Sequence, residues 1–319
     1  KYTPNGAHVW TTEAFGGTAS PAPRGENISL DGQGNIYVTG SFSADVIDFD
    51  PDDPTQGELT RNPIHHRSDF ALKLDSEGGF QWVHSFGYAF VFDGGGGYYE
   101  HATGDGVYLS GDLSGSVGAY VAKLDPFDGS VDWLKTTGDG IDDVSLMGLT
   151  VDRMGNGWTT GTLSSHRADF DPDPDSTHYV YRESIGSPKY SWQGIVWKLD
   201  NDGEFVWADN LRGDISSGTD ITTGPEDTIY VSGYFEKKTD FDPGPDDDIR
   251  DGKGSTSGYV LALNNDGSYR WAADFADRDR SWVHQLAVDD SGNVYAHGMF
   301  YGTIDFDPTE GTTELTSAA

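Results

Sequence analysis

The chain lacks cysteine, has few basic residues and contains no long apolar run. Its 319 residues include no Cys, which excludes a disulfide scaffold and thiol chemistry. Only 20 Lys and Arg stand against 53 Asp and Glu, and the net charge of −33 argues against binding to nucleic-acid phosphates. No apolar stretch approaches the roughly 18 residues that a membrane-spanning helix needs. With 13% aromatic residues and 43 Gly, the composition indicates an ordered, acidic, all-β protein.

Two short signatures alternate along the sequence. The first is GNIYVTG in residues 34–40, and its copies end at Gly111, Gly161, Gly233 and Gly298. The second is KLDSEGGFQW in residues 73–82; its copies end at Trp133, Trp207 and Trp271, and a further copy opens the chain and ends at Trp10. Each repeat predicts four short strands joined by turns rich in Asp, Gly and Asn. In the first repeat these strands are residues 28–30, 35–42, 70–74 and 80–84, and no segment of the chain predicts a helix.

A repeat of about 50–70 residues with four strands is typical of a propeller blade. The sequence therefore predicts an all-β fold, a β-propeller of five four-stranded blades, as a single domain over residues 1–319. The tryptophan that ends each second signature is expected to wedge between blades. Residues 1–17 are expected to complete the last blade, which residues 283–316 begin. The alternatives are a partial arc of a larger propeller, and a terminal strand donated to another copy. A start inside a repeat, without an initiator Met, favours processing or trimming.

The recurrence of GNIYVTGSF, DFDP and KLDxxGxxxW in this order resembles the bacterial SBBP-type β-propeller repeat proteins. The resemblance covers nearly the whole chain and implies a secreted or cell-surface protein. It does not specify an activity, because propellers host binding proteins and enzymes alike. The second signature also resembles the tryptophan-docking repeat of quinoprotein propellers, although the Thr-Gly-Lys turn of those proteins is absent and the sequence shows no quinone-type site.

The DFDP motif, which four of the five repeats share, is the sharpest chemical feature of the sequence. If the motif continues a strand, both Asp side chains lie on one face, Phe enters the sheet contact and Pro ends the strand. Two such carboxylates repel unless they are compensated, and Ca²⁺ with oxygen ligands is the predicted compensation. The alternative is that they cap backbone N–H groups of a hairpin. The predicted metal ligands are Asp48, Asp50, Asp169, Asp171, Asp240, Asp242, Asp305 and Asp307.

Catalytic motifs are weak, and no catalytic residue is assigned. The sequence contains no HExxH, no G-x-S-x-G and no P-loop. Its nine His are scattered, among them His65 and His66, and surface or hydrogen-bonded roles are favoured for them. Four aromatic residues, Tyr179, Tyr181, Tyr190 and Trp192, are candidates for stacking on sugars, but packing within their own loop is favoured.

These features favour a binding or structural module over an enzyme. The interpretation is an extracellular, Ca²⁺-stabilised propeller that serves binding, adhesion or assembly on a bacterial surface, with a protein or carbohydrate ligand. Neither a nucleic-acid partner nor a membrane span is expected. The alternative is a polysaccharide-acting hydrolase or lyase with its site on the face that carries the long loops.

Overall fold

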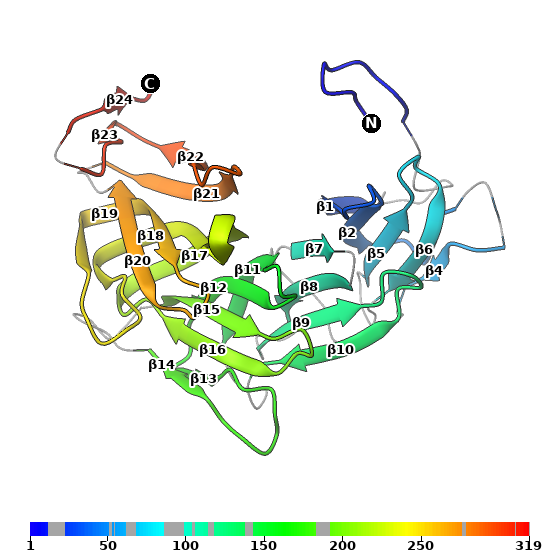
Figure 1. Cartoon of the computed structure of the whole chain (residues 1–319), viewed down its shortest axis with the longest axis horizontal. Helices are drawn as coiled ribbons and strands as arrows, with labels where there is room; N and C mark the ends of the chain where they lie inside the picture. Colours follow the sequence, from blue (N-terminus) through cyan, green and yellow to red (C-terminus); the bar gives the residue numbers. More distant parts are fainter. Residues whose placement is uncertain are drawn as a thin grey trace. The chain divides into compact units, whose positions relative to one another are not determined.

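The computed structural model describes residues 1–11, 23–50, 53, 55–61, 68–85, 99–103, 106–113, 118–137, 143–182, 192–275, 279–309 and 311–318. Within these ranges the secondary structure is β, apart from one 3-10 turn, η1 (Pro225–Asp227). The part of the chain described here holds no helix that could cross a bilayer. The predicted all-β class is confirmed (Figure 1).

Four sheets have four strands each, and their strands neighbour one another in chain order. The first is β1 (Arg24–Leu30), β2 (Ile36–Phe42), β5 (Ser68–Leu74) and β6 (Phe80–Ser85). The second is β7 (Tyr99–Thr103), β8 (Gly106–Asp112), β9 (Ala119–Leu124) and β10 (Val131–Thr136). The third is β11 (Val144–Val151), β12 (Gly157–Leu163), β15 (Gln193–Leu199) and β16 (Phe205–Asn210). The fourth is β17 (Gly213–Thr223), β18 (Ile229–Asp240), β19 (Ile249–Leu263) and β20 (Tyr269–Phe275). The four strands predicted for the first repeat are thus confirmed.

The remaining strands form two-stranded sheets. A fifth pair, β21 (Ser281–Val288) and β22 (Val294–Phe300), corresponds to the first two strands of a repeat. Three small hairpins carry DFDP motifs, and the sequence did not predict them as strands. They are β3 (Val46–Asp48) with β4 (Glu58–Thr60), β13 (Arg167–Asp169) with β14 (Tyr179–Tyr181), and β23 (Thr303–Asp305) with β24 (Glu314–Thr316). In the fourth sheet the equivalent residues prolong β18 and β19.

The glycine that closes the first signature lies opposite a β-bulge. In the third sheet the bulge lies between Leu146 and Gly148 of β11, and Gly161 of β12 pairs with Leu146. A Cβ on Gly161 would overlap the carbonyl oxygen of Ser145 and would lie 2.8 Å from the Cα of Leu146. Gly40, Gly233 and Gly298 face a strand carbonyl in the same way. The repeated glycine is therefore required by the close approach of the bulged strand.

The tryptophan that ends the second signature packs on a turn of the following repeat. Gly129 has a φ of +73°, and its missing Cβ leaves room for the ring of Trp82, whose Cε3 would lie 2.7 Å from that atom. Trp10 lies on Gly78 in the same way, and Trp207 lies on Gly267. Because an L side chain would both clash and strain these turns, glycine is needed on two counts. The predicted wedge is confirmed for these three tryptophans, whereas Trp271 is 39% exposed.

The chain divides into two compact units, one of residues 1–115 and 121–134, the other of residues 116–120 and 135–319. In the first unit the core contains Phe42, Phe49 and Phe70, with Trp10 packed against it. In the second, Trp158 and Val196 of the third sheet pack with Ile221, Val231 and other apolar residues of the fourth. Residues 12–17 of the predicted closing segment lie outside the described residues, and ring closure stays a prediction.

Candidate functional site

The first Asp of each DFDP motif caps the turn of its own hairpin. Asp169 Oδ1 accepts hydrogen bonds from the backbone N–H of Asp171 (3.1 Å) and of His178 (2.7 Å). The other first-position carboxylates accept the N–H two residues on, at 2.9 Å for Asp48, 3.1 Å for Asp240 and 3.0 Å for Asp305. Asp240 and Asp305 also reach the opposite side of the turn, at the N–H of Asp248 and Thr313. This is the capping arrangement that the sequence left as an alternative to metal binding.

The second Asp of the motif organises the tip of the hairpin. Asp171 Oδ1 accepts the N–H of Asp173 (3.0 Å), and its Oδ2 accepts the Ser176 hydroxyl (2.6 Å). Asp50, Asp242 and Asp307 accept from Gln56, Gly244 and Thr309 respectively. These bonds place all eight predicted ligand residues in hairpin turns.

The sequence suggested that the motif continues a strand through both Asp residues, and the structure shows that it does not. Strands β3, β13, β18 and β23 end at the first Asp. The reason is that its carboxylate bonds to N–H groups further along, which turns the chain before the second Asp. The Phe does enter the sheet contact: Phe49 lies 4.6 Å from Phe70, and Phe241 lies 4.9 Å from Tyr259, between ring centroids. The buried Phe thus anchors the hairpin to its sheet.

The fit of these hairpins to Ca²⁺ is partial. Each supplies two carboxylates, whereas Ca²⁺ takes six to eight oxygens. Within the described ranges, no three His, Asp or Glu side chains gather where they could hold a metal ion. Backbone carbonyls and water would have to supply the remaining ligands.

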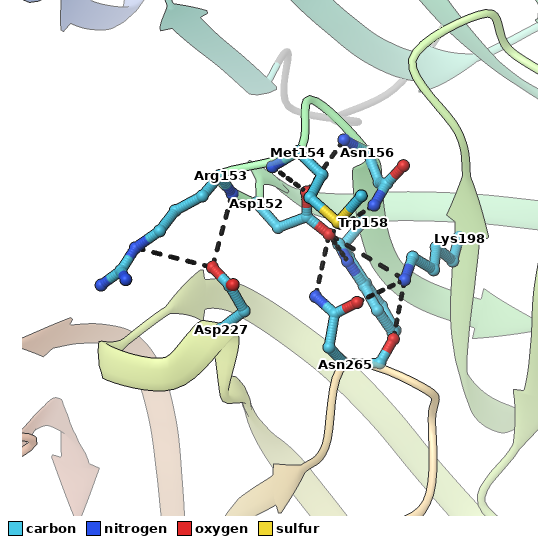
Figure 2. A network of polar contacts seen from close by, with 8 residues as sticks. All are labelled: Asp152, Arg153, Met154, Asn156, Trp158, Lys198, Asp227 and Asn265. Carbon is cyan, nitrogen blue, oxygen red and sulfur yellow. Dashed lines mark hydrogen bonds and ion pairs between the residues drawn. The ribbon is translucent and has the colours of Figure 1, made fainter.

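A denser polar cluster surrounds Asp152, in the turn between β11 and β12 (Figure 2). Its Oδ1 accepts the N–H groups of Met154 (2.9 Å) and Asn156 (3.0 Å). Its Oδ2 accepts the side chains of Asn156 (2.7 Å), Trp158 (3.3 Å) and Asn265 (2.9 Å). Lys198 Nζ lies 3.9 Å from the same oxygen. Nearly every hydrogen-bonding position of this buried carboxylate is thereby occupied.

Lys198 is the best-buried cation of this cluster. Its Nζ donates to the backbone oxygen (2.7 Å) and the Oδ1 (2.8 Å) of Asn265 and lies 4.6 Å from the centroid of the Trp158 ring. Burial lowers the pKa of Lys198, against the attraction of Asp152 and other acids. Burial acts to raise the pKa of Asp152, but hydrogen bonds led by that from Asn265 outweigh it, so the pKa is lowered. A buried ion pair with perturbed pKa values is a usual pointer to a functional site.

The same contacts recur in other repeats, which identifies their role as structural. Lys73 Nζ donates to the carbonyl of Pro126 (2.6 Å), and Lys1 Nζ donates to that of Ser76 (3.0 Å). In each case the acceptor is the second residue of the next repeat's turn, as Asn265 is for Lys198. We call this contact, with the tryptophan on the turn glycine, the Lys–Trp interlock. The cluster in Figure 2 is thus one copy of a joint between successive sheets, strengthened by Asn265. The recurrence of Lys in the second signature is the one sequence signal for this joint.

Asp227 of η1 extends the cluster toward Arg153. Its Oδ1 lies 3.7 Å from Arg153 Nε and accepts the Arg153 N–H at 3.5 Å (Figure 2). Both Glu226 and Asp227 have a positive φ, 60° and 54°, which costs roughly 1–2 kcal/mol per non-glycine residue. This turn therefore differs from the Asp-x-x-Gly-Asn turns of the neighbouring repeats.

The remaining candidates are two histidines and the four aromatic residues that were considered for stacking on sugars. His65, His66 and Tyr190 lie outside the described residues, and Trp192 contributes its backbone carbonyl, which accepts the N–H of Ser216 (3.0 Å). Arg167 stacks over Tyr179, 4.1 Å from the ring centroid, so this tyrosine packs within its own hairpin. Tyr181 remains 46% exposed.

Comparisons with known proteins find likeness in structure only. No protein-family model and no curated protein sequence matches the chain. Among solved structures, the quinohemoprotein alcohol dehydrogenase ADHIIG of Pseudomonas putida HK5 is 13% identical, with a TM-score of 0.42 over 86% of this chain. The PQQ domain of pyranose dehydrogenase from Coprinopsis cinerea is 11% identical, with a TM-score of 0.27, over 86% of this chain and 90% of that one. A europium-containing methanol dehydrogenase is 12% identical, with a TM-score of 0.32, over 88% and 80%.

The chain spans 38% of the length of the first of these proteins. The likeness concerns PQQ-type propeller dehydrogenase domains and is one of structure alone.

Proposed function

We propose that this chain is a binding or assembly module that presents its DFDP hairpins to a ligand. The supporting observation is that side chains in these hairpins alternate between inward and outward positions. Their inward positions are apolar in the three separate hairpins, at Ile47, Ala168 and Ile304, which are at most 1% exposed. Their outward positions differ between copies. The pairs are Val46 with Thr60, Arg167 with Tyr181, and Thr303 with Thr316.

A constant inner face and a varied outer face are what a display scaffold requires. The inner face fixes the hairpin to the sheet, so outer side chains can change with little effect on stability. The recurrent Lys, Asp and Trp side chains are used in joining one sheet to the next, as the Lys–Trp interlock illustrates. The alternative of a polysaccharide-acting hydrolase or lyase would use the same hairpin surface.

The finer fold that we propose is a five-bladed propeller in which the termini complete one blade. Ile36 pairs with Leu74, and Tyr37 pairs with Lys73, between the second and third strands of the first repeat. Val294 and Tyr295 occupy the corresponding places in β22, and Tyr2 and Lys1 occupy those of Leu74 and Lys73. The proposal therefore pairs Val294 with Tyr2, and Tyr295 with Lys1.

Two single-residue observations support this completion. Each described interlock covers a turn glycine with a tryptophan, but a Cβ on Gly6 would meet no atom within 4 Å. Trp271, the last tryptophan of the series, is 39% exposed. The proposal makes these two residues the halves of one more interlock.

A cysteine pair tests the closure, because the natural chain has no Cys. We would oxidise a Tyr2→Cys, Val294→Cys variant and compare it with both single variants on non-reducing gels. A cross-link within one chain is expected. A cross-linked dimer or ladder would instead mean strand donation between copies, and no cross-link would mean a partial arc of a larger propeller.

The cellular setting and the metal belong to the same proposal. The SBBP-type resemblance supports a secreted or surface-bound bacterial protein. The paired carboxylates of the DFDP hairpins support Ca²⁺ as a stabilising ion, with first-position residues such as Asp169 and second-position residues such as Asp171 as ligands. The ion would offset the repulsion between these carboxylates and other acids nearby.

Binding without turnover is the decisive functional test. The protein is to be assayed on arrayed glycans and on insoluble bacterial polysaccharides, and the same polysaccharides are to be assayed for new reducing ends or unsaturated ends. Retention without cleavage is the expected result. Cleavage would establish the enzyme alternative, and neither retention nor cleavage would remove a carbohydrate ligand from the proposal.

A further inference from the structure

A polar hollow of about 280 Å³ lies beside the exposed tyrosine of the β13–β14 hairpin. It is lined by the end of β14, the end of β16 and the DFDP turn of the next repeat. This volume is near the lower end of what small-molecule pockets show, so it suits a ligand of one ring. All of its lining residues belong to the second compact unit.

The aromatic wall of the hollow is Tyr181, which is held in place while its ring stays accessible. Arg167 Nη1 donates to the Tyr181 hydroxyl at 3.4 Å, and the backbone oxygen of Tyr181 accepts Asn210 Nδ2 at 2.8 Å. Asn210 is 3% exposed, so this anchor is buried, whereas Tyr181 is 46% exposed. A fixed aromatic ring with little conformational freedom to lose is a good stacking surface.

The polar wall offers acceptors beside a cation whose charge is already compensated. His178 Nε2 donates to the carbonyl oxygen of Ala208 at 3.3 Å, because a carbonyl oxygen can only accept. Asp209 also lines the hollow. Arg212 Nη2 is bonded to Asp240 at 2.7 Å and to the carbonyl oxygens of Asp242 and Gly244, so the guanidinium adds no net positive charge and Nη1 is the nitrogen left to donate.

We propose that this hollow binds one neutral hexose unit of a polysaccharide, with the Tyr181 ring stacked on the sugar and His178, Asp209 and Arg212 facing its hydroxyl groups. The inference rests on the proposed binding function and assigns it a ligand class. A sugar hydroxyl both donates and accepts, which matches mixed donors and acceptors around an aromatic ring. An acidic sugar is disfavoured because the hollow offers no uncompensated cation among its described lining residues and the chain carries a net charge of −33.

Saturation-transfer NMR with glucose, galactose and mannose, and with glucuronic acid as the charged comparison, tests this assignment. At least one neutral hexose should bind, and glucuronic acid should not. Tyr181→Ala should weaken that binding about tenfold, since stacking contributes roughly one such factor. Tyr181→Phe should stay within about threefold of the natural protein because the ring remains. Tyr301→Ala is the matched control, because Tyr301 is 59% exposed in a different part of the chain.

Two results would overturn the assignment: no binding of any neutral hexose, or equal binding by the natural protein and Tyr181→Ala. Retention of a polysaccharide by Tyr181→Ala at natural strength would reject this hollow while leaving the binding module intact. A failure of the natural protein to retain any polysaccharide would reject the hexose assignment and would remove the carbohydrate ligand from the proposed function, leaving a protein ligand. Unchanged melting curves for all variants separate loss of the site from loss of the fold.

Discussion

Replacing Gly161 by Ala should destabilise the third sheet severely. The added Cβ would overlap the Ser145 carbonyl oxygen and lie 2.8 Å from the Cα of Leu146, whereas ordinary contact begins at 3.4 Å. The two strands must therefore separate by at least about 0.6 Å at Leu146, and by more at the carbonyl. Both neighbours are backbone atoms of a paired strand, so no side-chain rotation relieves the overlap. We expect a loss of about 3 kcal/mol or more in the free energy of unfolding, at or above the upper end of typical overpacking effects.

Urea unfolding followed by tryptophan fluorescence measures this loss. The control is Gly32→Ala, in the turn between β1 and β2, where a Cβ meets nothing within 4 Å. Its effect should stay within about 0.5 kcal/mol, as for most surface substitutions. If Gly161→Ala costs less than about 1 kcal/mol, the bulge does not require glycine and the explanation of the repeated GNxYVTG ending fails.

Three further predictions concern charge. Lys198→Met should lower the free energy of unfolding, measured in urea, by about 3–5 kcal/mol, because it removes the cation beside the buried carboxylate of Asp152. Equal stability of the variant and the natural protein would mean that the interlock needs no charge. Burial raises the pKa of Asp220, against a hydrogen bond from the Leu286 N–H, so stability should fall as pH rises from the ordinary Asp pKa through the raised one. Asp220→Asn keeps an acceptor and should flatten that dependence in unfolding curves at pH 4 and pH 7, whereas an unchanged slope would assign it to other groups. Removing Ca²⁺ with a chelator should lower the melting temperature, and millimolar Ca²⁺ should restore it; no shift and no binding heat by calorimetry would leave the DFDP carboxylates as hairpin caps.

The four-strand repeat could be predicted from the sequence because its determinants are local. Turn residues such as Asp31 and Gly34 act within a few positions: Asp31 accepts the N–H groups of Gln33 and Asn35, and Gly34 has a φ of +82°. The tryptophan wedge was predictable for a similar reason, since a large side chain recurring once in each repeat must meet a neighbouring repeat.

The sequence left the DFDP hairpin caps only as an alternative, because strand periodicity and turn capping use the same residues. An Asp two positions from another looks like alternation along a strand, but a short carboxylate beside free N–H groups bends the chain instead. The Lys–Trp interlock was missed for a different reason. Its acceptor is a backbone carbonyl, as at Pro126, and a carbonyl leaves no signature in the sequence. Whether the hairpin carboxylates bind metal depends on ligands that main-chain atoms and water would supply.

The interlock has a consequence for assembly, because it joins two unlike surfaces. The ammonium and indole groups of one repeat donate hydrogen bonds to the turn of the next, so the contact is heterologous and has a direction. A heterologous contact closes into a ring only when its rotation divides the circle evenly, and otherwise it grows into an open helical array. The length and tilt of a short turn, such as the one that Gly129 forms, therefore help to determine how many repeats make a closed ring. Insertion of a single residue into that turn should change the number of repeats that a closed ring would need, and it should also change the stability of the fold.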